Sequence, residues 1–464
     1  MGFRGLSVIS LFFFLLVVAA HSNAAQAPAF AYILKSTNPG SVLVINTATA
    51  KLVKEVVVGN SPKGVAIDPV DGSHVYVLNN GTNTISTIDA YQNIKVGTDY
   101  YVDLNSGIGK CSAIDIAPDA SELYISCEAG IEVVDIADIE YTPEIKQIRV
   151  VKPLKYSGKG IRVDFDRRIA FSIGTINSGA GVSVIDIDFT NAKTGVQREF
   201  TSYKLDWGVM KDTGSTYFGS EGGMAIDTAK QLIYVANNWG NTVSVMKYIA
   251  SADSYIIENP LGTDVHVTIV RDGAQYSRPR DVILSPDKKY LYVAVFSDSN
   301  TGASRVSGQI QVLDVSQAEF GYVQQAITPV TLKNPVDWGT NHAFALSLYP
   351  DGSLYVIKDV WGANGDGSGG AGYYGATLTV ESLYDSFSGE FEGLRVTEIA
   401  PNTNFGIKGV SDMTGHIFIG PPCSLCPYGE APQAVKAQQI RPMSLDWMVL
   451  ILLLPLFARR YFLA

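Results

Sequence analysis

The stretch Gly64-Val-Ala-Ile-Asp-Pro-Val-Asp-Gly-Ser-His-Val-Tyr-Val-Leu-Asn-Asn80 decides the fold. It starts with a small residue, continues as an apolar strand that ends at Asp68, turns through a polar segment and resumes as a strand built on Tyr76 and Val77. Seven copies of this order occur in the chain, at residues 64–80, 113–125, 160–171, 223–238, 281–293, 344–356 and 409–419. Their spacing of roughly 47 to 66 residues indicates a repeat architecture.

A third strand of the form Val-Ser-Val-Ile-Asp follows many of these hairpins. It is found at residues 41–46, 84–89, 131–135, 182–186, 242–246 and 310–314. Three or four short antiparallel strands per repeat cannot bury a face alone, whereas closing the repeats into a ring buries both faces of each sheet. The pattern therefore predicts an all-β, seven-bladed β-propeller over residues 27–420. We expect the strands at 31–34 and 41–45 to complete the blade opened by residues 409–419.

Three strings resemble the YVTN β-propeller repeat, a family of lactonase-like propellers: Tyr234-Val-Ala-Asn-Asn238, Val243-Ser-Val245 and Val58-Gly-Asn-Ser-Pro-Lys-Gly-Val-Ala66. The resemblance spans roughly residues 30 to 420 and implies a seven-bladed propeller. The chain departs from the pattern where Phe171-Ser-Ile173 replaces Tyr-Val, and at long insertions over 187–220 and 359–405. Because propellers host many unrelated activities, the resemblance says little about function.

Composition excludes two classes of protein. Of the 464 residues, 46% are hydrophobic, which is too many for a disordered chain. The formal net charge of -10 argues against a nucleic-acid partner, since nothing neutralises a phosphate backbone in bulk.

The N-terminus has the features of a secretory signal peptide over residues 1–25. Arg4 precedes an apolar run from Val8 to Ala20, and the small residues Ser22 and Ala24 indicate cleavage after Ala24 or Ala25. The alternative is an uncleaved anchor, for which the run is short. We therefore expect an exported protein.

The C-terminus has a linker at 421–442 and a hydrophobic helix at 443–464. The apolar run from Trp447 to Ala458 is followed directly by Arg459 and Arg460, and it resembles the sorting tails of bacterial surface proteins. Twelve residues give about 18 Å of helix, which is short for a membrane core of about 30 Å. A plain terminal anchor is the alternative. Either way we expect tethering to the inner membrane at some stage, with a location in the periplasm or at the cell surface.

Four cysteines in an exported chain favour disulfides. Cys111 and Cys127 stand at the two ends of one predicted hairpin, so we expect them to be bonded. Cys423 and Cys426 in the linker indicate a small local disulfide, or a thiol used in processing the tail.

Two segments are candidate metal sites, and we otherwise expect no cofactor. Asn364, Asp366 and Ser368 alternate like the first half of a calcium loop, but Gly375 occupies the place of the expected bidentate Glu. A solvated Gly-rich turn is the alternative. Glu221 lies where propeller lactonases, as the resemblance implies, hold a divalent metal over the channel.

Basic residues precede or open several of the innermost strands. They are Lys63, Lys110, Lys159, Arg280, His342 and Lys408. Such a ring at one channel mouth would attract an anionic ligand. The alternative is that this turn position simply faces water and tolerates Lys or Arg.

Two functions of different classes remain open. The first is a non-catalytic binding or scaffold module of the cell envelope that presents the 187–220 and 359–405 insertions to an envelope protein, a glycan or an anionic ligand. Aromatic residues in these insertions favour it, namely Trp207, Tyr217, Trp361, Tyr373 and Tyr374. The second is a periplasmic lactonase-like hydrolase with a metal at the channel mouth.

Overall fold

A computed structural model describes residues 30–46, 51–102, 107–139, 142–151, 154–176, 179–187, 201–204, 223–237, 242–250, 255–258, 267–268, 276–298, 308–332, 340–348, 353–361, 370–384, 391–404 and 413–419. The chain divides into two compact units, Met1–Ser424 and Leu425–Ala464, and all of these residues belong to the first. Within them the only helical element is the short 3-10 helix η1 (Ala318–Phe320). The predicted all-β class is confirmed.

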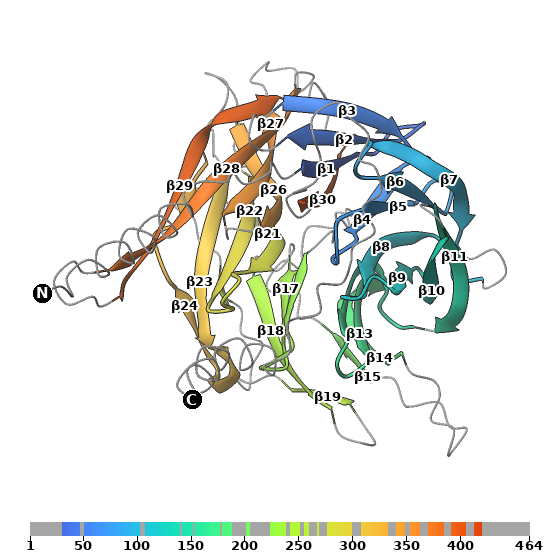
Figure 1. Cartoon of the computed structure of the whole chain (residues 1–464). Coiled ribbons are helices and arrows are strands. Elements are labelled where there is room, and N and C mark those ends of the chain that lie inside the picture. Colours follow the sequence, from blue (N-terminus) through green and yellow to red (C-terminus); the bar gives the residue numbers. More distant parts are fainter. Residues whose placement is uncertain are drawn as a thin grey trace, which may run out of the picture. The chain divides into compact units, whose positions relative to one another are not determined.

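The described strands form seven antiparallel sheets, which we number along the chain (Figure 1). Sheet 1 contains β1 (Phe30–Lys35), β2 (Ser41–Asn46), β3 (Lys51–Val57) and β30 (Met413–Ile419). Sheet 2 contains β4 (Pro62–Ile67), β5 (His74–Asn79), β6 (Thr84–Asp89) and β7 (Ile94–Tyr101). Sheet 3 contains β8 (Cys111–Ile116), β9 (Glu122–Cys127), β10 (Gly130–Ile139) and β11 (Thr142–Val151). Sheet 4 contains β12 (Gly158–Asp164), β13 (Ile169–Ile176), β14 (Gly179–Asp186) and β15 (Thr201–Lys204).

The later sheets follow the same order, and two of them carry one extra short strand. Sheet 5 contains β16 (Met224–Asp227), β17 (Leu232–Asn237), β18 (Thr242–Ala250), β19 (Tyr255–Glu258) and β20 (Val267–Thr268). Sheet 6 contains β21 (Tyr276–Leu284), β22 (Tyr290–Asp298), β23 (Gln309–Gln317), β24 (Tyr322–Gln325) and β25 (Val330–Thr331). Sheet 7 contains β26 (Thr340–Leu348), β27 (Leu354–Trp361), β28 (Gly370–Tyr384) and β29 (Phe391–Asn404).

Sheet 1 joins the two ends of the described chain. Strand β1 pairs with β2 on one side and with β30 on the other, so that Tyr32 lies opposite Phe418. This is the pairing that the sequence predicts.

The first strand of each sheet contacts the first strand of the next. The contacts run from β4 to β8, β12, β16, β21 and β26, then to β30 of sheet 1 and back to β4. Hydrophobic clusters fill the spaces between sheets 1 and 2 and between each following pair up to sheets 6 and 7. These seven strands therefore form a closed circle of neighbours.

Strand β17 shows why the inner strands are apolar on both faces. Leu232, Tyr234 and Ala236 pack against sheet 6, whereas the alternate residues Ile233 and Val235 pack against sheet 4. Because successive side chains of a strand point to opposite sides, a strand between two sheets reads as a continuous apolar run.

The turns between first and second strands place residues other than glycine at positive φ. These residues are Ala120, Arg168, Gln231 and Lys288, with φ between 56° and 59°. In sheet 2 the corresponding turn has a glycine, Gly72, at positive φ.

Strands occupy much of the predicted 359–405 insertion. Residues 370–384 and 391–404 form β28 and β29, which pair along most of their length at the outer side of sheet 7. The expectation of a displayed loop is therefore wrong for these residues, because the insertion lengthens two outer strands. Of the 187–220 insertion, the structure describes Ile187 and β15.

Both predicted end segments, with the linker, lie outside the described residues. In the part of the chain that the structure describes, no helix is long and apolar enough to cross a membrane.

Candidate functional site

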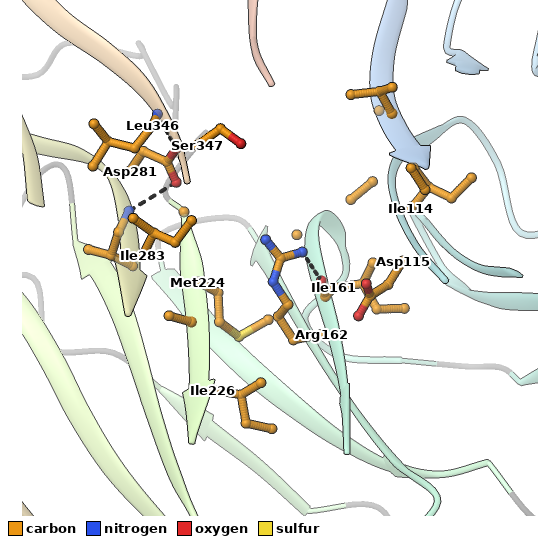
Figure 2. A pocket seen from close by; sticks show the side chains of 18 of the residues that line it. Ile114, Asp115, Ile161, Arg162, Met224, Ile226, Asp281, Ile283, Leu346 and Ser347 are labelled. Carbon is orange, nitrogen blue, oxygen red and sulfur yellow. Dashed lines mark hydrogen bonds between the residues drawn. The ribbon is translucent and has the colours of Figure 1, made fainter. Parts of the chain in front are cut away.

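A cavity of about 450 Å³ lies among the first strands of sheets 2 to 7 (Figure 2). Its lining comes from β4, β8, β12, β21 and β26, and from β16 with the preceding Gly223. Small residues such as Gly64, Ala113 and Gly160 leave space for the cavity. Its walls include the apolar residues Ile161, Met224 and Ile283. A cavity of this size is within the range of about 300–1,000 Å³ that is typical of small-molecule sites.

Asp115 on β8 faces this cavity and also ties sheet 3 to sheet 4. Its Oδ1 accepts a hydrogen bond from the backbone N–H of Ile116, and its Oδ2 accepts one from the N–H of Val163 on β12, both at 3.1 Å. Burial raises the pKa of Asp115, while the charge of Arg162 and the two hydrogen bonds act in the opposite direction.

Asp281 on β21 makes the equivalent link between sheets 6 and 7. Its Oδ1 accepts from the N–H of Val282 at 2.9 Å, and its Oδ2 accepts from the N–H of Leu346 on β26 at 2.8 Å. Burial raises the pKa of this carboxyl to about 6, although the Leu346 hydrogen bond and the charge of Arg162 oppose the shift. Asp281 is thus an acid whose protonation changes near neutral pH.

Gly223 makes room for the Asp281 carboxylate. A Cβ atom at position 223 would lie 1.9 Å from Oδ1 of Asp281 and 2.8 Å from its Cα. No side chain fits at that separation, so glycine is required here by close approach of β16 to β21.

Arg162 on β12 places a positive charge between the two carboxyls. Figure 2 shows its side chain in the cavity, with Asp281 on one side and Asp115 on the other. The guanidinium Nη1 donates to the carbonyl oxygen of Ile161 at 2.9 Å, and its charge lowers the pKa of both Asp115 and Asp281. Among the described residues Arg162 has no ion pair within 4 Å and donates one hydrogen bond, so these residues leave most of its five N–H donors unused.

The predicted basic residues fall at different places on the strands. Lys159 is the second residue of β12 and lines the cavity, and Lys63 is half-buried at the start of β4. Lys110 is exposed just before β8, and Arg280 directly precedes Asp281. His342 lies in β26 opposite Asp359. Lys408 and Glu221 lie outside the described residues, and the anion-attracting role of the ring stays a prediction.

The predicted Cys111–Cys127 disulfide is confirmed. The two residues face each other at the ends of β8 and β9, and both are fully buried. The side chain of Asn80 donates to the carbonyl oxygen of Cys111 at 2.9 Å, and the N–H of Cys111 donates to Asn83 Oδ1 at 3.1 Å. The disulfide therefore fixes the strand that carries Asp115. Cys423 and Cys426 lie outside the described residues.

The structure leaves the predicted metal sites untested. Asn364, Asp366 and Ser368 lie outside the described part of the chain, as does Glu221. Among the residues that are described, no group of three or more His, Cys, Asp and Glu side chains could hold a metal ion.

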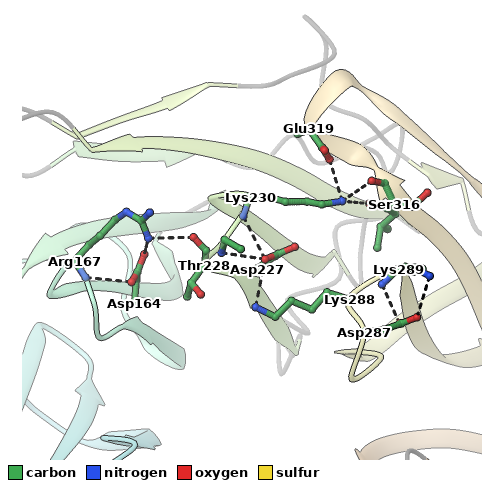
Figure 3. Close-up of polar contacts among 12 residues, drawn as sticks. Asp164, Arg167, Asp227, Thr228, Lys230, Asp287, Lys288, Lys289, Ser316 and Glu319 are labelled. Atoms are coloured by element: carbon green, nitrogen blue, oxygen red, sulfur yellow. Dashed lines mark hydrogen bonds and ion pairs between the residues drawn. The ribbon is translucent and has the colours of Figure 1, made fainter.

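A second set of charged residues lies at the turns that follow the first strands (Figure 3). Arg167 Nη1 pairs with Asp164 at 2.9 Å and also donates to the carbonyl oxygen of Thr228, at 3.0 Å. Lys288 Nζ pairs with Asp227 at 3.4 Å. Lys230 donates to the carbonyl oxygen of Ser316 and pairs with Glu319. The Arg167–Asp164 pair lies within sheet 4, and the other contacts join neighbouring sheets.

Sequence reasoning missed the three charged cavity residues, although a signal was present. Asp115 and Arg162 occupy the strand position that holds Ala66, Ala225 and Ile283 in other repeats. Asp281 likewise replaces a small residue, because Gly64, Ala113, Gly160 and Gly223 fill its position elsewhere. A charge at a repeat position that is otherwise apolar or small marks a lining residue.

No family model and no curated protein matches this chain. Among solved structures, it is similar to the periplasmic gluconolactonase of Pseudomonas aeruginosa, with 12% identity and a TM-score of 0.50 over 84% of this chain and 99% of that one. A putative 6-phosphogluconolactonase from Bacteroides fragilis matches with 15% identity and a TM-score of 0.47, over 86% and 99% of the two chains. A β-propeller domain from Myceliophteria thermophila matches with 10% identity and a TM-score of 0.41, over 72% and 90%. The fold is thus similar to that of the periplasmic gluconolactonase.

Proposed function

We propose that this chain is an exported, seven-bladed β-propeller of the YVTN type, which binds a small polar ligand in its central cavity as a binding module of the cell envelope. The seven sheets and the circle of contacts among their first strands support the seven-bladed architecture. The signal-peptide pattern at residues 1–25 and the apolar tail at 443–464 support export and tethering. An envelope protein or glycan that delivers or receives the ligand is the partner we propose.

The observation that carries this proposal is the trio Asp115, Arg162 and Asp281 in the cavity. Placing charges in a partly closed cavity costs free energy unless they are paired or used. Carboxylates are not needed to join the sheets, because Ala66 and Ala225 occupy the position of Asp115 at other sheet boundaries. A ligand that pairs with Arg162 accounts for charges that the fold itself does not require.

A thermal-shift screen tests the proposal directly. The full-length chain is heated with millimolar amino acids, sugar acids, polyols, choline and nucleotides, and a ligand that binds only the folded state raises the unfolding temperature. We expect at least one class to do so in the parent and not in Arg162→Gln. The proposal is overturned if no class shifts the parent, or if every shift persists in Arg162→Gln.

One observation favours a second candidate, lactone hydrolysis. The pKa of Asp281 is raised to about 6 at the cavity surface, which suits a general base near neutral pH. In this scheme Asp281 takes a proton from water as the water oxygen attacks the lactone carbonyl, and Arg162 stabilises the oxyanion. The ring C–O bond then breaks, and the proton passes to the leaving alkoxide to give a hydroxy acid.

Hydrolysis of glucono-δ-lactone separates the two candidates. A hydrolase of this kind loses at least about 100-fold in kcat in Asp281→Asn. Loss of activity with EDTA points instead to the metal site that the sequence predicts at Glu221. A rate equal to the uncatalysed one in the parent excludes the hydrolase for this lactone.

A further inference from the structure

The cavity lining carries opposite charges on opposite sides. Arg162 extends from β12, whereas Asp281 is held on β21 by the backbone N–H groups of Val282 and Leu346. Figure 2 shows Asp281 and Arg162 separated across the cavity, with Asp115 beyond Arg162. Each Asp281 oxygen accepts one hydrogen bond from the backbone, and a carboxylate oxygen has a further lone pair for a ligand.

The described part of the lining is balanced in charge. Its acidic residues are Asp115 and Asp281, and its basic residues are Lys159 and Arg162. In a space shielded from water, a ligand with net charge leaves that charge uncompensated, and the cost is high. A ligand that contains one positive and one negative group adds no net charge and can pair with both signs.

The walls between these charges are apolar. Ile161, Met224, Ile226, Ile283 and Leu346 line the cavity. A ligand with an apolar body removes both surfaces from water, which favours binding. Polyhydroxylated ligands would leave hydroxyl groups without partners against these walls.

We propose that the cavity binds a small zwitterion with an apolar body, an α-amino acid being the simplest, whose carboxylate pairs with Arg162 and whose ammonium group pairs with Asp281. The inference rests on the proposed function, because it names the class of ligand for the same cavity. Arg162 matches a carboxylate through two parallel N–H donors, and Asp281 offers acceptors to an ammonium group.

Three molecules of nearly the same shape test the charges separately. Leucine carries both groups, 3-methylbutylamine lacks the carboxylate, and 4-methylpentanoate lacks the amine. Calorimetric titration of the full-length chain in mild detergent is expected to show leucine binding at least about tenfold more tightly than either analogue.

Two variants should each lose one of these preferences. Arg162→Gln is expected to bind leucine and 3-methylbutylamine equally, and Asp281→Asn is expected to bind leucine and 4-methylpentanoate equally. Arg162→Lys keeps the charge and should retain part of the preference for leucine over the amine. Lys289→Gln, at an exposed turn position, is the matched control and should bind as the parent does. An unfolding curve for each variant establishes that it is folded.

The outcomes separate this inference from the proposed function. If gluconate or a polyol binds in a way that depends on Arg162 while leucine does not, the zwitterion is excluded and the proposed function stands. If leucine binds equally well to the parent and to Arg162→Gln, the assignment of its carboxylate is wrong. A leucine concentration of about 10 mM reveals even weak binding. If leucine fails to bind the folded parent at that concentration, the inference is overturned.

Discussion

Two sets of charged residues lie on the first strands and their turns, and they differ in how the charges are satisfied. At the turns, Asp164 and Asp227 each have a basic side chain within ion-pair distance, namely Arg167 and Lys288. In the cavity, the partners that the described residues give Asp115 and Asp281 are backbone N–H groups, and the partner that they give Arg162 is one carbonyl oxygen. The turn charges are paired with one another and serve the structure, whereas the cavity charges can still pair with a ligand.

The difference teaches that exposure of a charge and availability for binding are separate properties. Lys288 has a side chain 41% exposed and is already paired, while Arg162 is half-buried and has donors to spare. Surface charges of the first kind contribute little free energy, and buried ones of the second kind are costly unless they are used.

The largest expected effect concerns the disulfide that anchors β8, the strand of Asp115. Replacing Cys111 and Cys127 with Ala together should lower the free energy of unfolding by roughly 3 kcal/mol, because the bond closes a loop of 16 residues in the unfolded chain. Urea unfolding of the variant and the oxidised parent measures this. Equal midpoints and slopes would show that the bond adds no stability.

A pH series distinguishes the cavity carboxylate from a turn carboxylate. Burial raises the pKa of Asp281 from 3.8 to about 6, so the folded state binds this proton more tightly than the unfolded chain. Stability from this group is therefore greatest below pH 4 and is lost as the pH rises through 6. Relative to Asp281→Asn, the parent should gain on the order of 2 kcal/mol in unfolding free energy between pH 7 and pH 4.

Asp119, in the turn after β8, supplies the contrast for that series. Hydrogen bonds from Ser121 lower its pKa, so its contribution is present above the unfolded pKa of about 4 and is lost as the pH falls. Relative to Asp119→Asn, the parent should therefore lose stability on acidification. If the difference in unfolding free energy between parent and variant changed with pH in the same direction for Asp281→Asn and Asp119→Asn, the distinction between cavity and turn carboxylates would be wrong.

The smallest effects concern two adjacent lysines of one turn. Lys288 pairs with the buried Asp227, whereas Lys289 pairs with the exposed Asp287. We expect Lys288→Gln to cost about 1 kcal/mol and Lys289→Gln less than about 0.5 kcal/mol in unfolding free energy. Both values are read from thermal unfolding in low salt, and an equal cost would mean that burial of Asp227 does not matter.

The sequence predicts the inner strands well because they are buried on both faces. Continuous apolar runs such as Val42-Leu-Val-Ile45 recur in each repeat, and the repeat order also predicts the pairing of β1 with β30. The disulfide is predictable because its cysteines flank one hairpin. These features depend on local pattern and on the count of repeats.

The site was not predicted because the repeat pattern averages over the positions that matter. Asp115 and Arg162 stand out only when the repeats are compared position by position, because Ala66 and Ala225 occupy the same position. The ion pairs of Arg168 with Glu122 and of Lys288 with Asp227 were also not predicted, since each joins two neighbouring sheets. For the same reason, the search for basic residues at strand entries found Lys159 but not Arg162, three residues further on.

A crystal structure of the chain grown with leucine tests the central claim most directly. We predict electron density for the ligand in the cavity, with its carboxylate within hydrogen-bond distance of Arg162 and its ammonium group within that distance of Asp281. Under conditions that saturate binding in solution, density only at the outer basic residues, such as Lys63 or Lys110, would contradict the account. So would a cavity that contains nothing but water.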